Sequence, residues 1–198
     1  EKRAQMHDRN HHLSMLYMLI QVNQVDKAKE YLKGMVGEIQ NVEARVRSGN
    51  PALNALIRSK IALGKQSKVR VVFSVLSELK GMCVCDWDLN RIIGNLLDNA
   101  IEAVEDIDVD ESERVVELLI EGGEEYNRIE VITYGVVISD QAEAHIFEKG
   151  YSSKEERGHG LGLAICKELI DEYNGQITII KDQKQVYTSF KVLLPVCK

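Results

Sequence analysis

The sequence predicts an α+β protein, in which an N-terminal helical hairpin is followed by a two-layer α/β sandwich. Over about the first 65 residues, apolar side chains recur at helical spacing. From residue 69 onward, β-branched and alternating runs typical of strands are separated by helical runs. We therefore expect two domains, 1–65 and 66–198.

The first domain carries two apolar stripes. One face of the first helix holds Met6, Leu13, Leu16, Tyr17 and Ile20. A break is expected at residues 23–25, with Asp26 as N-cap of the next helix. That helix has a seam of alternating four- and three-residue spacing at Ala28, Leu32, Met35, Ile39, Val42 and Val46. Two such helices cannot bury their stripes alone, so we expect a hairpin that pairs with a second copy in a four-helix bundle.

A shorter helix at 52–64 is expected to lead into the second domain, where strands and helices follow in turn. Strands are predicted at 69–76, 115–122, 129–134, 176–181 and 187–194, and helices at 87–105, 141–147 and 163–173. Residues 148–160 are rich in glycine, serine and charge and lack periodicity, which predicts a mobile loop. Strands separated by helices, several of them antiparallel neighbours, predict the two-layer sandwich.

The bulk properties exclude some partners. The 198 residues are 44% hydrophobic with a net charge of -6, whereas non-specific binding to nucleic acid or to membrane surfaces requires clustered positive charge. No apolar run approaches the roughly 20 residues that cross a bilayer. We expect neither nucleic-acid binding nor membrane contact by this chain.

The four cysteines are Cys83, Cys85, Cys166 and Cys197. They form no disulfide framework at this chain length, so we expect structural thiols in a reducing cytosol. Cys83 and Cys85 resemble half of a metal site, but no second pair completes it. The start at Glu1, in a charged helical pattern without methionine or signal peptide, indicates a fragment whose parent could carry a membrane segment.

The helix expected at 87–105 has a polar stripe on an otherwise apolar surface. Asn95, Asn99 and Glu102 recur at intervals of four and three. A carboxamide oxygen can bind Mg²⁺ and a carboxamide nitrogen can donate to a phosphate. A stripe that merely faces solvent is the alternative, and this helix alone leaves both open.

A glycine cluster at 158–163 opens the last predicted helix. Its glycines, Gly158, Gly160 and Gly162, allow backbone N–H groups to approach a phosphate at the helix N-terminus. No strand precedes the cluster and no Gly-Lys-Ser/Thr follows, which excludes the dinucleotide fingerprint and the P-loop.

These motifs together resemble those of a known family. Residues 95–104, 146–154 and 158–163 resemble the asparagine box, lid and second glycine box of sensor histidine kinases, and more loosely those of the GHKL ATPases gyrase, Hsp90 and MutL. His7-Asp8 with His12-Leu13 resembles the phosphoacceptor helix of citrate/fumarate-type and quorum-sensing kinases, and 54–60 resembles their second helix. The resemblance implies a GHKL (Bergerat) sandwich that binds ATP and Mg²⁺ and phosphorylates its own histidine.

The resemblance also implies roles for particular residues. His7 would accept the phosphoryl group, and Asp8 would orient its imidazole or take its proton. Asn99 would hold Mg²⁺, with Asn95 near the phosphates. Thr133 would lie at the adenine base. The remaining nucleotide-binding residues would be Gly135, Lys154, Gly158, His159, Gly160, Leu161 and Gly162. The implied partners are a second copy of the chain and a response-regulator receiver domain, whose aspartate receives the phosphoryl group in the cytoplasm.

Two departures from the family pattern leave alternatives open. Thr133 stands where relatives carry an adenine-binding Asp, and Val137 replaces the second glycine of that box; the lost charge-assisted bond would cost about 1.5–3 kcal/mol. His11 stands where relatives commonly carry Asn, and its spacing from His7 could bind zinc, although facing solvent is the favoured reading. The alternatives to a kinase are an impaired phosphotransferase or scaffold with a degenerate nucleotide site, and an ATPase that does not phosphorylate itself.

Overall fold

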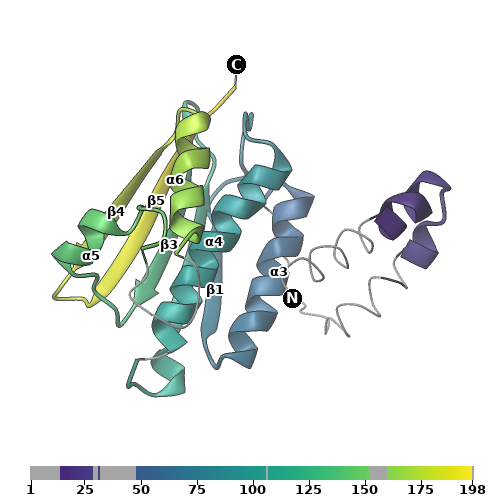
Figure 1. The fold of residues 1–198 in the computed structure, drawn as a ribbon. Helices are drawn as coiled ribbons and strands as arrows, with labels where there is room; N and C mark the ends of the chain where they lie inside the picture. Colours follow the sequence, from purple (N-terminus) through teal and green to yellow (C-terminus); the bar gives the residue numbers. More distant parts are fainter. Residues whose placement is uncertain (1–13, 29–30, 32–47, 106, 152–159, 198) are drawn as a thin grey trace. The chain divides into compact units, whose positions relative to one another are not determined.

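The computed structural model describes residues 14–28, 31, 48–105, 107–151 and 160–197, and the chain divides into two compact units, 1–41 and 42–198 (Figure 1). Each unit is described by itself below. The predicted His7, Asp8 and most of the heptad seam lie outside the described residues.

In the first unit, residues 14–21 are helical and residues 25–28 are helical again. Asn23 has a positive φ of 57°, and Gln24 N donates to Leu19 O (2.8 Å) while Asn23 N donates to Ile20 O (3.0 Å). These bonds form a Schellman-type end, in which asparagine tolerates the left-handed conformation. The predicted break is confirmed. Asp26 as its N-cap is wrong, because the helical bond from Ala28 N to Gln24 O (3.1 Å) starts the next helix before Asp26.

The second unit is built on a five-stranded sheet of order β1-β2-β3-β5-β4. The strands are β1 (Arg70–Val75), β2 (Val115–Glu121), β3 (Tyr126–Tyr134), β4 (Gln176–Asp182) and β5 (Tyr187–Pro195). β1 pairs parallel with β2, and the other neighbours are antiparallel. All five predicted strands are confirmed, and β3 begins three residues earlier than predicted.

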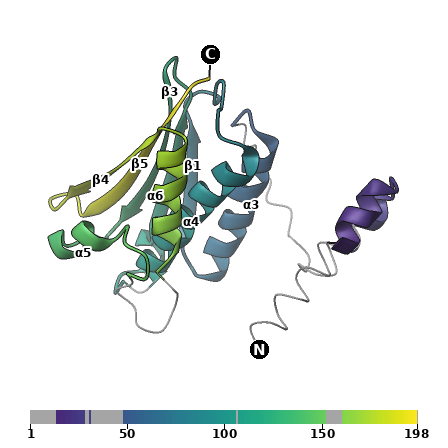
Figure 2. The same ribbon diagram turned by 45° about the horizontal axis from the view of Figure 1, so that its top comes forward.

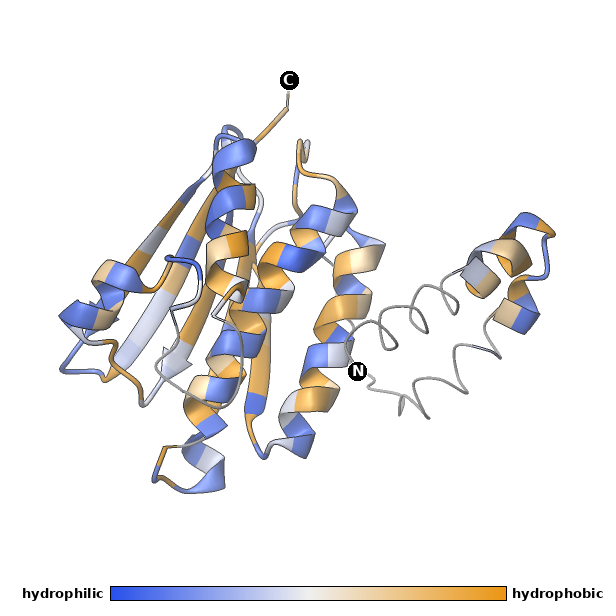
Figure 3. Cartoon of the chain, in the orientation of Figure 1, coloured by the Kyte–Doolittle hydropathy of each residue, from blue (hydrophilic) through white to orange (hydrophobic). Residues whose placement is uncertain are grey.

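Three helices cover one face of this sheet side by side, as Figures 1 and 2 show. They are α3 (Pro51–Gln66), α4 (Asp86–Glu105) and α6 (Gly162–Glu172). A short helix, α5 (Asp140–His145), and a 3-10 turn at Glu111–Glu113 complete the unit. Figure 3 shows hydrophobic and hydrophilic residues alternating along these elements, as expected where one side of each is buried.

The core lies between α4 and the inner face of the sheet. The predicted apolar side of α4 is buried as expected: Ile92, Ile93, Leu96, Leu97, Ala100, Ile101 and Val104. The alternate residues of β2 and β3 that face the helices, such as Leu118, Ile120 and Val131, are buried with them. The two-layer sandwich is therefore confirmed.

Helix α3 packs within the second unit. Leu53, Ile57 and Ile61 are buried in the same core as α4, and Lys60 pairs with Asp98 of α4 at 2.5 Å. The contact boundary at residues 41/42 thus differs from the division at 65/66, because the sequence groups helices by composition whereas packing joins α3 to α4. The division of the chain into two functional domains, 1–65 and 66–198, stays a prediction.

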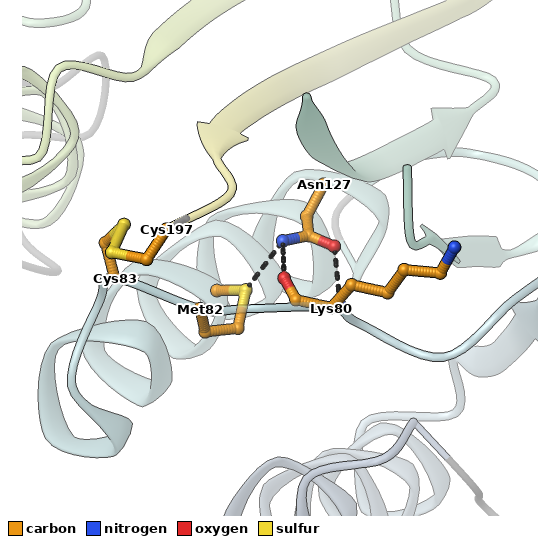
Figure 4. The surroundings of a disulfide bond; sticks show 5 residues. All are labelled: Lys80, Met82, Cys83, Asn127 and Cys197. Carbon is orange, nitrogen blue, oxygen red and sulfur yellow. Dashed lines mark hydrogen bonds between the residues drawn. A yellow bond between two sulfur atoms is a disulfide. The ribbon is translucent and has the colours of Figure 1, made fainter. Parts of the chain in front are cut away.

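The prediction of four free thiols is wrong for one pair. Cys83 and Cys197 form a disulfide with Cα atoms 5.3 Å apart, although 114 residues separate them (Figure 4). The pairing arises because the chain after β5 returns alongside residues 81–83, a proximity that spacing in the sequence does not reveal. Cys85 and Cys166 are free thiols, as predicted.

A buried asparagine holds the segment before Cys83. Asn127 is 0% exposed; its Oδ1 accepts from Lys80 N (2.9 Å) and its Nδ2 donates to Lys80 O (2.7 Å) (Figure 4). Asn127→Ala leaves both backbone groups unpaired, and we expect it to lower the free energy of unfolding by about 2–4 kcal/mol, to be measured by urea titration. The control is a substitution of Asn174, which is exposed and has a positive φ of 55°. Asn174→Gly removes its side chain and tolerates that backbone conformation, so it separates the side-chain effect from the strain that Asn174→Ala would add. A loss below about 0.5 kcal/mol for Asn127→Ala would contradict this role.

Candidate functional site

Asn95 joins α4 to the start of α6. Its Nδ2 donates to Gly162 O at 3.3 Å, and a Cβ on Gly162 would lie 3.7 Å from the Asn95 Cβ. The Cys166 thiol on α6 donates to Ile92 O of α4 at 3.4 Å, and burial raises the pKa of that thiol to about 12, so the thiol stays protonated. Asn95 therefore positions the first turn of α6 against α4.

Asn99 lies one turn further along α4 and is only partly buried. No described residue forms a hydrogen bond with its side chain, in contrast to Asn95. Its carboxamide therefore keeps both an oxygen acceptor and two N–H donors for a ligand. Of the two asparagines in the polar stripe of α4, Asn95 thus holds the fold, whereas Asn99 has no hydrogen-bond partner in the described part of the chain.

The predicted glycine cluster is described in its second half. Gly160 has φ +56°, and a Cβ there would lie 2.4 Å from Tyr151 O. Gly150 N donates to Gly160 O at 3.1 Å, so the two ends of the segment between them meet at one point. Lys154, Gly158 and His159 belong to that segment and lie outside the described residues.

The N-terminus of α6 is open to an anion. Its N-cap residue, Leu161, makes no side-chain cap hydrogen bond, and the first turn holds no acidic residue. Within the described part of the chain, no side chain bonds the first N–H groups of this helix, and the helix dipole favours negative charge at this end.

Thr133 and Gly135 lie at the end of β3. Thr133 is 3% exposed and is paired across the sheet with Val116 and Thr188. Gly135 has φ +79° and a Cβ there would lie 2.9 Å from Ile107 Cδ1, a turn that favours glycine. The residue that replaces the expected aspartate is thus a buried, neutral hydroxyl.

Thr188, on β5, was not identified from the sequence. Its hydroxyl accepts from Ile138 N (3.0 Å) and donates to Val136 O (2.9 Å). It therefore pins the chain after Gly135 against β5. The available signal was a hydroxyl at an inward position of a strand whose other inward residues, Phe190 and Val192, are apolar.

The described residues limit how a metal ion could be bound at this end of the helical layer. Among them, no group of histidine, cysteine, aspartate or glutamate could hold a metal ion. A cation here would instead take an amide oxygen, such as that of Asn99, together with oxygens of its own anionic ligand, which is the usual arrangement for Mg²⁺ and phosphates. The first N–H groups of α6 and the Asn99 carboxamide both lack a side-chain partner among the described residues, and such groups suit a phosphate-bearing ligand.

Comparison with known proteins agrees with this chemistry. Residues 86–198 match the family described as histidine kinase-, DNA gyrase B-, and HSP90-like ATPase. Over 98% of its length, the chain is 31% identical to the sensor protein CitS of Bacillus subtilis, of which it covers 35%. It is 27% identical, again over 98% of its length, to a probable C4-dicarboxylate sensor kinase of Halalkalibacterium halodurans, of which it covers 36%. The chain therefore spans about a third of these relatives.

Solved structures show the same fold. The catalytic domain of histidine kinase ThkA has a TM-score of 0.57 at 24% identity, covering 73% of this chain and 94% of that one. Full-length ShkA in complex with AMPPNP has a TM-score of 0.60 at 19% identity, covering 81% of this chain and 34% of that one. Among the helices described, none is long and apolar enough to cross a membrane. By its sandwich and its match over residues 86–198, the chain belongs to the histidine kinase-, DNA gyrase B-, and HSP90-like ATPase family, and its similarity within that family is to sensor histidine kinases.

Proposed function

We propose that this chain is the catalytic portion of a sensor histidine kinase. It transfers the γ-phosphoryl group of ATP to His7 and then passes that group to an aspartate of a response-regulator receiver domain. The observation that carries the proposal is the Asn99 carboxamide, which has no hydrogen-bond partner among the described residues and lies one turn of α4 from the Asn95 that contacts the uncapped start of α6, in a family of ATPases. The relatives named as a probable C4-dicarboxylate sensor kinase and a sensor protein, each similar over 98% of this chain, support it.

The nucleotide site is proposed from the residues of the sandwich. The first N–H groups of α6 and the backbone at Gly160 would bind phosphate oxygens, and Asn99 would hold Mg²⁺ through its amide oxygen. When bound, Mg²⁺ supplies neutralisation of the charge on the transferring phosphoryl group. Asn95 keeps α6 in place through Gly162. The other proposed nucleotide contacts are Thr133, Gly135, Lys154, Gly158, His159, Leu161 and Gly162.

The proposed phosphoacceptor is His7, with Asp8 beside it. One imidazole nitrogen attacks the γ-phosphorus, the bond between that phosphorus and the β–γ bridging oxygen breaks, and ADP leaves with the electron pair. The N–H on the other side of the ring becomes more acidic as positive charge develops on the imidazole. Asp8 accepts a hydrogen bond from that N–H or takes its proton, which orients the ring and stabilises the charge.

Residues 1–65 are proposed to form a hairpin that dimerises as a four-helix bundle, and residues 66–198 to form the ATP-binding domain. The exposed apolar side chains of the first unit support this, since Tyr17, Met18, Ile20 and Val22 are 58–64% exposed in the single chain. We place the chain in the cytoplasm. Its net charge of -6 disfavours contact with nucleic acid and with the membrane surface.

A second candidate is a phosphotransfer protein or scaffold whose nucleotide site no longer works. Thr133 favours it, because a buried neutral hydroxyl replaces a carboxylate that would bind the base. The open α6 terminus and the free Asn99 favour the kinase.

Incubation of the chain with Mg²⁺ and γ-labelled ATP tests the proposal. We expect acid-labile, base-stable label on the protein, and transfer of that label to an added receiver domain. A folded dimer that takes no label from ATP, yet accepts it from a phosphorylated receiver domain, would support the second candidate instead.

Thr133 offers a test of the base-binding end. We expect Thr133→Asp to tighten ATP binding about ten- to hundredfold, because a carboxylate restores a charge-assisted hydrogen bond to the adenine amino group. Equilibrium titration with ATP measures the change, and the nearly isosteric but neutral Thr133→Asn is the control. Equal affinities for the two variants would mean that this position does not contact the base.

A further inference from the structure

We propose that Cys83 and Cys197 form a reversible redox site that exchanges with low-molecular-weight thiols and disulfides. In its oxidised form the site clamps the end of β5 to the segment that leads into α4. The proposal is independent of nucleotide binding and of phosphoryl transfer.

Backbone contacts hold the two cysteines adjacent without the sulfur bond. Cys197 N donates to Gly81 O at 2.7 Å, and Met82 and Val196 form an antiparallel bridge. Gly81 has φ +43°, and a Cβ there would lie 2.8 Å from Val196 Cγ1. Because these contacts align the chains, the thiols remain neighbours after reduction and can be oxidised again.

The segment that leads to Cys83 is also held by β3. Asn127 binds both backbone groups of Lys80, and its Nδ2 lies 3.1 Å from Met82 Sδ. Figure 4 shows these groups gathered on the segment that ends at Cys83. The cysteine therefore projects from a segment anchored to β3.

The site is accessible, unlike an ordinary buried crosslink. Cys197 is exposed and Cys83 is half-buried, so a thiolate from solvent can reach the Cys197 sulfur; exposed disulfides are the more labile ones. Of the other two cysteines, Cys166 is buried with its pKa raised to about 12 by that burial. Cys85 is exposed, and its thiol donates to Asp88 Oδ2 at 3.2 Å.

The exchange proceeds in two balanced steps. A thiolate RS⁻ attacks Cys197 Sγ, the Cys83–Cys197 bond breaks, and Cys83 leaves as a thiolate that takes up a proton. A second RS⁻ attacks the mixed disulfide and releases Cys197 as a thiol and the product RSSR. Two electrons pass from two RSH to the protein disulfide, and RSSR reverses the sequence.

The clamp is expected to govern the stability of the second unit. The disulfide closes a loop across 114 residues, which contains β2 to β5, α4 and α6. Such a crosslink restricts the unfolded chain, so reduction should lower the Tm by on the order of 10 °C. Helix α4, which carries Asn95 and Asn99, begins at Asp86, shortly after Cys83.

The full chain is equilibrated with reduced and oxidised glutathione at graded ratios, quenched with acid, alkylated and mapped by mass spectrometry. We expect one two-electron transition that links Cys83 with Cys197, accompanied by the shift in Tm. Cys197→Ser, at the exposed end, should lose the transition and the shift while staying folded, and Cys83→Ser should agree with it. Cys85→Ser should retain both.

Four results would overturn the proposal. The pair could remain as thiols in oxidised glutathione alone, or the disulfide could persist in the folded protein in excess reduced glutathione. A disulfide that involves Cys85, or a Tm unchanged by reduction, would equally exclude the clamp.

Discussion

Replacing His7 with glutamine is expected to abolish labelling of the chain by γ-labelled ATP, a loss of at least about 100-fold. Glutamine keeps a polar side chain of similar length but offers no nucleophilic nitrogen. ATP binding, measured by equilibrium titration, should be unchanged, because the proposed nucleotide site belongs to the sandwich.

His11→Gln and His12→Gln are the matched controls, since they remove a neighbouring imidazole from the same segment. Both should retain acid-labile label. If His7→Gln keeps its label and one of these variants loses it, the phosphoacceptor has been misassigned. If all three retain it, the label is not on this segment.

Asn99→Ala is expected to lower autophosphorylation by about 100-fold or more, since it removes the only side-chain oxygen that we assign to Mg²⁺. The affinity for ATP in the presence of Mg²⁺ should also fall. Stability should change little, because no described residue hydrogen-bonds the Asn99 side chain. Labelling, ATP titration and thermal unfolding measure the three quantities.

Asn90→Ala is the matched control on the same helix. The Asn90 Oδ1 is buried without a hydrogen-bond partner among the described residues. Its removal should therefore change the stability little and leave the labelling unchanged. If Asn99→Ala unfolds the protein, or leaves labelling at the level of Asn90→Ala, Asn99 has a structural role and the metal assignment fails.

Unlike Asn99→Ala, Asn95→Ala is expected to lower the stability of the protein, because the Asn95 side chain donates a hydrogen bond to Gly162 O. The sequence placed both asparagines on one stripe, and the family resemblance assigned both to the nucleotide site, Asn99 to Mg²⁺ and Asn95 near the phosphates. Their spacing was visible, but the approach of α6 to one of them was not, since 67 residues separate Asn95 from Gly162.

Local pattern predicted the sandwich well for physical reasons. Alternation in β2 and β3 reports which side of a strand is buried, and the seven apolar positions of α4 report one buried helix face. Both periods follow from backbone geometry, so one sequence suffices to read them. Helix α3 was also predicted, yet its packing against α4 was not, because an amphipathic stripe does not specify its partner.

The sequence by itself determined the order and type of the elements in the second unit, and the residues whose chemistry suits phosphate and Mg²⁺. The tertiary structure decided which residues meet: the return of the chain after β5 that joins Cys83 to Cys197, and the contact of Asn95 with α6, whereas Asn99 has no such partner among the described residues. Periodicity is a property of neighbours along the chain, whereas these pairings depend on how the sheet and its helices fold residues distant in sequence against one another.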